Sequence, residues 1–165
     1  MAPQVVLVDF GAGNLRSLAN ALRDCGASVT ITNDPKVASA ADRLVLPGQG
    51  AFAPAMRELR ERGLDDVIRE HVQRERPLLG VCVGAQVCME RGDEGGETTG
   101  LGLVKGVVVK LSAKRLPHMG WADIYDGKRG HLVGCFYFAH SYSMRPAEYA
   151  TTVCHGVTFY EGRPF

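Results

Sequence analysis

Residues 78–86 read LLGVCVGAQ, an apolar run that leads into a cysteine framed by two glycines. Gly80 lies two residues before Cys82, and Gly84 lies two residues after it. This spacing predicts a nucleophile elbow, a tight strand-to-helix turn in which flanking side chains would collide with the neighbouring strand or helix. An ordinary buried cysteine at the end of a strand would show the same spacing, so the pattern alone leaves both interpretations open.

The elbow would have chemical consequences for Cys82. It would lift the thiol out of the sheet to the N-terminus of a helix, where unpaired N–H groups and the helix dipole favour thiolate over thiol. The N–H of Val83, the next residue, would point at an oxyanion formed when the sulfur attacks a carbonyl. The stretch therefore predicts a nucleophile with an oxyanion donor beside it.

Upstream of the elbow, strand-like and helix-like segments alternate. The predicted strands are Val5–Val8, Ser28–Thr32, Arg43–Leu46 and Pro77–Val81. The predicted helices have apolar positions at Leu15, Leu18, Ala19 and Leu22, a start at Asn33-Asp34-Pro35, and the span Pro54–Arg74 with a break at Gly63. Because strands joined by helices run parallel, we expect an α/β fold with a three-layer, open, mainly parallel sheet flanked by helices.

The C-terminal half has a different character. Its strand-like segments are Val107–Leu111, Trp121–Tyr125, Val133–Ala139 and Tyr149–His155, with turns at Asp126-Gly127 and Arg129-Gly130. We expect antiparallel strands here, attached to the parallel half as one continuous or folded-over sheet. No repeat or linker divides the chain, which predicts one domain over residues 1–165.

Composition excludes several classes of protein. The 165 residues carry 19 Lys+Arg against 18 Asp+Glu, so a net charge of +1 gives no reason to expect nucleic acid or anionic membrane as partner. The longest stretch without Asp, Glu, Lys or Arg is the 15 residues Gly130–Met144, short of the ~20 that span a bilayer. Asp9 would interrupt the apolar region of a signal peptide. We expect a soluble cytoplasmic protein.

Cysteine spacing predicts neither metal nor cofactor. The five cysteines contain no CxxC pair, which disfavours a zinc ribbon or a thioredoxin-like site. Cys25, Cys88 and Cys135 have apolar neighbours and are interpreted as core residues, whereas the sequence leaves Cys154 undecided.

A dinucleotide-binding turn is a competing hypothesis for residues 8–16. They read VDFGAGNLR, and Asp34 follows about twenty residues later, as in nucleotide-binding βαβ units. However, Arg16 stands where the third glycine is needed for close packing of helix on strand. A plain glycine turn explains the segment better.

Six segments together resemble a known family. They are Asp9-Phe10-Gly11-Ala12-Gly13-Asn14-Leu15, Leu46-Pro47-Gly48-Gln49-Gly50-Ala51-Phe52, the elbow with Gln86, Gly100-Leu101-Gly102-Leu103, Pro117-His118-Met119-Gly120-Trp121 and Tyr137-Phe138-Ala139-His140-Ser141-Tyr142. The chain resembles the class I (triad type) glutamine amidotransferases. Within them it is similar to the glutaminase subunits of imidazole glycerol phosphate synthase, from histidine biosynthesis.

The resemblance implies a glutaminase site and gives each matching residue a role. Cys82 would attack the side-chain amide of L-glutamine, form a thioester and release ammonia, with Val83 and the Gly48-Gln49 loop as oxyanion hole. The substrate would be held by Gln86, Glu94, His140, Ser141 and Tyr142. From the residues alone, Glu94 equally fits a solvated loop charge and His140 a core histidine.

The resemblance also implies a partner. The interface would consist of His118, Met119, Gly120 and Trp121. They would face a cyclase subunit with a (β/α)8 barrel, in a heterodimer, and the ammonia exit. An ordinary turn with one buried tryptophan is the alternative for this segment.

The chain departs from the family pattern in three places. Ala122 replaces the usual asparagine after Trp121, and the elbow reads CVGAQ where CLGMQ is commoner. The family also carries its catalytic base and orienting carboxylate in a His-Pro-Glu segment, and no His-x-Glu occurs among the 165 residues.

The missing His-Pro-Glu segment leaves three hypotheses. We expect a chain truncated at its C-terminus. The first alternative is a non-catalytic partner that docks on the cyclase and has lost glutaminase activity. Another cysteine-elbow α/β protein, such as a stress-response member of the superfamily, would leave the His118–Trp121 segment unexplained.

Overall fold

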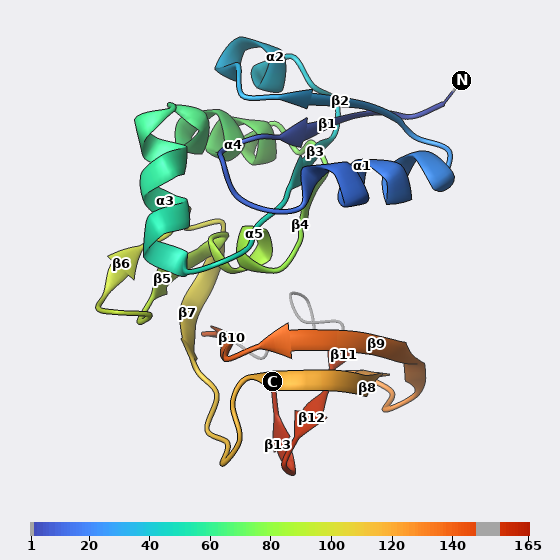
Figure 1. Ribbon diagram of the computed structural model, residues 1–165, viewed down its shortest axis with the longest axis vertical. Coiled ribbons are helices and arrows are strands. Elements are labelled where there is room, and N and C mark those ends of the chain that lie inside the picture. The colour runs from blue at the N-terminus through green and yellow to red at the C-terminus, as the bar shows by residue number, and fades with distance from the viewer. Residues whose placement is uncertain (1, 148–155) are drawn as a thin grey trace.

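The computed structural model describes residues 2–147 and 156–165. In the first half the elements are β1 (Gln4–Val8), α1 (Leu15–Asp24), β2 (Ser28–Thr32), α2 (Pro35–Ser39), β3 (Leu44–Leu46), α3 (Phe52–Glu61), α4 (Leu64–Gln73), β4 (Leu78–Gly80) and α5 (Val83–Gln86). The strands form a parallel sheet in the order β2-β1-β3-β4, with helices around it (Figure 1). The alternation of strands and helices in the sequence is therefore confirmed.

Successive residues of the buried strand β3 pack into two different hydrophobic clusters. Leu44 and Leu46 of β3 pack into the cluster that also contains Met56 of α3 and Ile68 of α4. Val45, between them, packs with Ala19 of α1 in a second cluster. Because successive side chains of a strand point to opposite faces, both faces of the sheet are covered by helices. This is the three-layer arrangement that the sequence predicted.

The second half consists of strands. They are β5 (Met89–Gly92), β6 (Thr98–Thr99), β7 (Val104–Lys110), β8 (His118–Asp126), β9 (Leu132–His140), β10 (Tyr142–Pro146), β11 (Gly156–Val157), β12 (Phe159–Tyr160) and β13 (Arg163–Pro164). Most of their pairings are antiparallel, as predicted, with β5 on β7 the parallel exception. The predicted strand Tyr149–His155 lies outside the described residues.

The connection between the two halves differs from the expectation. The strands after β4 form sheets of their own, in the orders β10-β7-β5-β6, β11-β8-β9 and β12-β13, instead of one continuous sheet. Figure 1 shows β8 and β9 below the parallel half, with β7 leading down to them. The charged pair Glu90-Arg91 gave no apolar alternation, so the sequence did not indicate β5.

The predicted helix break at Gly63 is confirmed, whereas the predicted burial of two cysteines is wrong. The long helix divides at Gly63, which has a φ of 64° and precedes α4, as expected. Cys25 and Cys135 are exposed, so their interpretation as core residues is wrong. Cys25 follows the last turn of α1, and Cys135 lies on the outer face of β9, where apolar neighbours in sequence do not imply burial.

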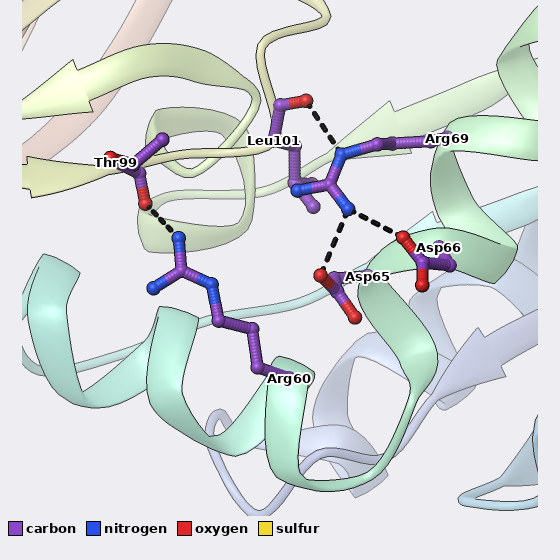
Figure 2. Close-up of polar contacts among 6 residues, drawn as sticks. All are labelled: Arg60, Asp65, Asp66, Arg69, Thr99 and Leu101. Carbon is purple, nitrogen blue, oxygen red and sulfur yellow. Dashed lines mark hydrogen bonds and ion pairs between the residues drawn. The ribbon is translucent and has the colours of Figure 1, made fainter.

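Two arginines fasten the hairpin of β5 and β6 to the helices (Figure 2). Arg60 of α3 donates to the carbonyl oxygen of Thr99 at 2.6 Å. Arg69 of α4 donates to the carbonyl oxygen of Leu101 at 3.1 Å and pairs with Asp65 and Asp66 at 2.9 and 2.8 Å. The segment that follows β6 is thereby held at fixed distances from α3 and α4.

None of the described helices is both long enough and apolar enough to cross a membrane.

Candidate active site

Cys82 occupies a strained turn between β4 and α5. Its φ of 55° and ψ of −120° lie in a region that residues with a side chain rarely adopt, at a cost of about 1–3 kcal/mol. The thiol is exposed. A strained, exposed cysteine between the end of a strand and the start of a helix is the geometry of a nucleophile elbow, and it excludes the buried cysteine considered as the alternative.

The two glycines around Cys82 are required by close packing. A Cβ on Gly80 would stand 2.6 Å from Cα of Ala85, and a Cβ on Gly84 would overlap the carbonyl oxygen of Leu46. The backbone of α5 therefore crosses directly over the end of β3. The helix that follows Cys82 has only four residues, so any helix-terminus effect comes from the free N–H groups of this single turn.

The expected oxyanion donors lie next to each other. A Cβ on Gly48 would stand 2.9 Å from the carbonyl carbon of Val83, so the Gly48 loop packs on the first residue of α5. Within the described part of the chain, the N–H of Val83 donates no hydrogen bond. Gln49, next to Gly48, is exposed. The site thus has a backbone donor left free beside Cys82.

Gly13 also supports this loop, a role that the sequence pattern did not indicate. Gly13, with a φ of 103°, brings the turn after β1 against the same loop, and a Cβ there would stand 3.2 Å from Cβ of Pro47. The Gly-x-Gly signal that suggested a dinucleotide turn therefore serves the packing of one loop on another. It could have been found by asking which loops meet at the carboxyl edge of a parallel sheet.

A cavity of about 610 Å³ lies between the elbow and the strands of the second half. Four of the predicted site residues line it: Cys82, Gln86, His140 and Tyr142. The Nε2 of Gln86 donates to the carbonyl oxygen of Tyr142 at 3.1 Å. Clefts of this size, with apolar walls and a few polar groups, are typical of small-molecule sites.

The other predicted substrate residues lie outside this cavity. Glu94 is half-buried at the N-terminus of α3, where its Oε2 accepts a hydrogen bond from the N–H of Phe52 at 2.8 Å. Ser141 joins β9 to β10, and its carbonyl oxygen accepts from the N–H of Leu111 at 2.9 Å. Glu94 is thus a helix-capping carboxylate, which its place in a glycine-rich loop did not indicate.

The predicted interface segment is divided between two faces of β8. Met119 and Trp121 are 63% and 72% exposed, and Trp121 meets Tyr137 of β9 edge to face, with ring centroids 5.7 Å apart. His118 is 4% exposed and faces the other way. The tryptophan is therefore on the surface, which excludes the alternative of an ordinary turn with a buried tryptophan.

Burial changes the acidity of two groups near the site. Burial lowers the pKa of His118, and the neighbouring His140 lowers it further. Burial raises the pKa of the Cys88 thiol to about 11, and its Sγ contacts the carbonyl oxygen of Gly84 at 3.3 Å. Cys88 is therefore a protonated thiol near neutral pH and does not compete with Cys82 as nucleophile.

A strained cysteine elbow at the carboxyl edge of a parallel sheet, beside a free backbone donor and a cavity, is an arrangement for acyl transfer from a carbonyl substrate. The family model for class-I glutamine amidotransferases matches residues 6–161, and the chain belongs to this family.

Relatives define the position of the chain within the family. Imidazole glycerol phosphate synthase subunit HisH of a Thermus thermophilus strain is 44% identical over 167 residues, which cover 100% of this chain and 82% of that protein. The HisH subunit of Aquifex aeolicus is 43% identical over 153 residues, covering 88% of this chain and 74% of that protein. The resemblance seen in the sequence is therefore confirmed.

Solved structures agree on the fold. A crystal structure of a glutamine amidotransferase aligns with a TM-score of 0.71 at 21% identity, covering 87% of this chain and 75% of that one. The structure of PurLQS from Thermotoga maritima aligns with a TM-score of 0.70 at 17% identity, covering 98% and 77%. The predicted α/β fold class is thereby confirmed.

Proposed function

We propose that this chain is the glutaminase subunit of an imidazole glycerol phosphate synthase and that Cys82 is its nucleophile. The Cys82 sulfur attacks the side-chain carbonyl carbon of L-glutamine, forming a C–S bond as the carbonyl oxygen becomes an oxyanion. The C–N bond then breaks, ammonia leaves with an added proton, and water hydrolyses the thioester to glutamate. Ammonia passes to a cyclase subunit with a (β/α)8 barrel.

The observation that carries this proposal is the strained conformation of Cys82 next to a free N–H. Val83 and the Gly48-Gln49 loop would stabilise the oxyanion, a contribution of about 3–4 kcal/mol for each well-placed donor. Gln86, Glu94, Ser141 and Tyr142 would hold the substrate, and His140 would line the site beside them. No metal or cofactor has a role in these steps. We also propose that residues 1–165 act as one amidotransferase domain, in the cytoplasm.

The exposed face around Met119 and Trp121 supports the partner in this proposal. Val133 and Tyr137 of β9 extend it, at 60% and 55% exposure. An apolar strand face this exposed favours burial against another protein. We expect the barrel cyclase to cover it. The same exposed face would also serve a second candidate function, docking on the cyclase without hydrolysis of glutamine.

Reaction with a chloromethyl ketone analogue of glutamine tests the nucleophile without requiring turnover. The Cys82 sulfur displaces chloride and forms a stable thioether, which intact-mass analysis detects. We expect saturable labelling that L-glutamine prevents and that D-glutamine leaves unchanged. Cys82→Ser is the control and should abolish the adduct. Labelling that does not saturate, or that falls on another cysteine, would contradict the proposal.

Measurement of ammonia release distinguishes the glutaminase function from docking without hydrolysis. The departing amine needs a proton donor, and loss of the base of a nucleophile–base pair costs up to about 10⁶ in rate. These 165 residues should therefore release little ammonia with the cyclase, and grafting a family segment with His-Pro-Glu should restore release that depends on Cys82. Turnover by the ungrafted chain, lost on His140→Ala, would show that a local histidine is the base. A grafted chain that binds the cyclase but stays inactive would favour the docking function.

A further inference from the structure

A continuous chain of hydrogen bonds joins β8 to the helix of the elbow. Nδ1 of His118 lies 3.2 Å from Nε2 of His140. The Nδ1 of His140 lies 2.9 Å from the carbonyl oxygen of Tyr142, and the same oxygen accepts from Nε2 of Gln86 at 3.1 Å. Four residues from β8, β9, β10 and α5 are thereby connected through three hydrogen bonds.

The chemistry of the acceptor fixes the direction of this chain. A carbonyl oxygen cannot donate, so Nδ1 of His140 carries a proton, and in the neutral ring its Nε2 must then accept. Nδ1 of His118 is therefore the donor to His140. Both nitrogens of His140 are engaged, so its ring acts through Tyr142 instead of offering a free nitrogen to a substrate.

His118 is held rigidly at the start of this chain. It is 4% exposed, and its ring stacks on Tyr160 with centroids 4.0 Å apart and on Phe138 at 5.5 Å. Phe165 meets the His118 ring edge to face at 5.5 Å. A ring packed on three sides has one orientation, so its N–H points in a constant direction.

Gln86, at the other end of this series of hydrogen bonds, lines the cavity with Cys82. Because Nε2 of Gln86 is bound to Tyr142, the amide is oriented with Oε1 free to accept from an N–H of a ligand. Among the described residues, no group donates to this oxygen. The orientation of Gln86 therefore depends on a carbonyl that His140 and His118 hold in place.

We propose that His118 is a positioning residue for Gln86 in glutamine binding, acting through His140 and the carbonyl of Tyr142. This inference rests on the proposed function, because it assumes that Gln86 contacts glutamine. It assigns His118 to the substrate site instead of the partner interface predicted from sequence. His118 shares β8 with Met119 and Trp121, so the strand that bears the exposed face also orients the substrate site.

The test separates affinity for the glutamine chloromethyl ketone from reactivity of Cys82. His118→Phe keeps an aromatic ring for stacking and removes the donor to His140. It should raise the half-saturating ketone concentration about three- to tenfold, the effect of one oriented hydrogen bond, and leave the rate of labelling by iodoacetamide unchanged. His118→Asn should recover much of the affinity, since its amide nitrogen occupies the position of Nδ1. His131→Phe, at an exposed histidine, is the matched control and should behave as wild type.

A double-mutant cycle tests whether His118 affects ketone binding through Gln86. In a Gln86→Ala background, His118→Phe should have no further effect on the half-saturating concentration, because the side chain that it orients is gone. Ring ¹⁵N shifts should show His140 as the Nδ1–H tautomer in the wild type, and its Nε2 resonance should shift in His118→Phe, where this nitrogen no longer accepts a hydrogen bond. Unchanged ketone affinity in His118→Phe, or a full effect in the Gln86→Ala background, would overturn the proposal. If the wild type itself fails to saturate, the proposed function fails, whereas the ring ¹⁵N shifts still decide whether His118 orients His140.

Discussion

The carboxylate of Glu94 and the backbone N–H of Phe52 are joined by a hydrogen bond of 2.8 Å. Glu94 belongs to the loop between β5 and β6, and Phe52 is the first residue of α3, directly after the loop that contains Gly48. One side chain therefore links the candidate substrate-binding hairpin to the candidate oxyanion loop. A negative charge at this end of α3 also suits the helix dipole.

Replacement of Glu94 should affect both loops. Glu94→Ala removes the acceptor of the Phe52 N–H and should lower the free energy of unfolding by about 1–2 kcal/mol, measured by urea denaturation. Glu94→Gln keeps an acceptor oxygen and should retain most of that stability. It should still bind the glutamine chloromethyl ketone more weakly, because it cannot pair with the substrate ammonium. Equal loss of stability in both variants would show that the charge, not the hydrogen bond, holds the helix.

The cysteines should differ in reactivity. Cys82 is exposed beside a free N–H, whereas burial raises the pKa of Cys88 to about 11. Partial desolvation by neighbouring atoms and the nearby Asp123 also raise the pKa of the exposed Cys135. We expect iodoacetamide near neutral pH to label Cys82 first and Cys88 last among the cysteines in the described residues, as read by peptide mass spectrometry. Faster labelling of exposed Cys25 would mean that the elbow does not activate its thiol.

Gly84→Ala should disrupt the elbow. The added Cβ would overlap the carbonyl oxygen of Leu46, which is backbone and cannot move aside as a side chain could. We expect a loss of about 2–4 kcal/mol in the free energy of unfolding, together with slower labelling of Cys82. Gly130→Asn is the control, since Gly130 has open space around it and a φ of 67° that asparagine tolerates. A normal stability for Gly84→Ala would contradict the packing described here.

Trp121 should report on the partner. It is the only tryptophan of the chain and is 72% exposed. Titration with a tryptophan-free barrel cyclase should shift its emission to shorter wavelength as the indole leaves water. Trp121→Ala should weaken the complex by about 2 kcal/mol or more, as for a central aromatic contact. No spectral change, with no co-elution on gel filtration, would argue against docking through this face.

Stability should fall as the pH is lowered through the range in which histidines titrate. Burial lowers the pKa of His71 and of His118 below the ordinary value of 6.5. Just below pH 6.5 these two histidines are therefore protonated to a greater extent in the unfolded chain than in the folded chain. The free energy of unfolding is therefore unaffected well above 6.5 and decreases as the pH falls below it. Urea midpoints at about pH 7.5 and about pH 5.5 measure this, since carboxylates stay mostly ionised between these values. His118→Phe should show a smaller difference between the two midpoints than His131→Phe.

Sequence patterns predicted the parts of the molecule that short-range rules control. The strands of the parallel sheet, the break at Gly63 and the turn at Cys82 each follow from apolar runs or glycines in adjacent positions. The strand at Met89–Gly92 was missed because its partner, β7, lies further along the chain and supplies the pairing. Alternation along β8 could have separated His118 from Met119 and Trp121, but the sequence did not indicate which face is buried. The link from Glu94 to Phe52 joins residues 42 positions apart and has no local signature.

The anchoring of the hairpin by Arg60 and Arg69 has a consequence for how this protein can change. Both guanidinium groups bind main-chain oxygens, those of Thr99 and Leu101, and every amino acid supplies such an oxygen. The hydrogen bond from Arg60 therefore does not depend on the side chain at position 99, and substitutions of Thr99 leave it in place. Arg60 and Arg69 cannot be substituted in the same way, because a shorter or uncharged side chain would leave a main-chain carbonyl oxygen without its hydrogen bond. Redesign of this loop to accept a different amide can thus begin with the hairpin while the two helices are kept unchanged.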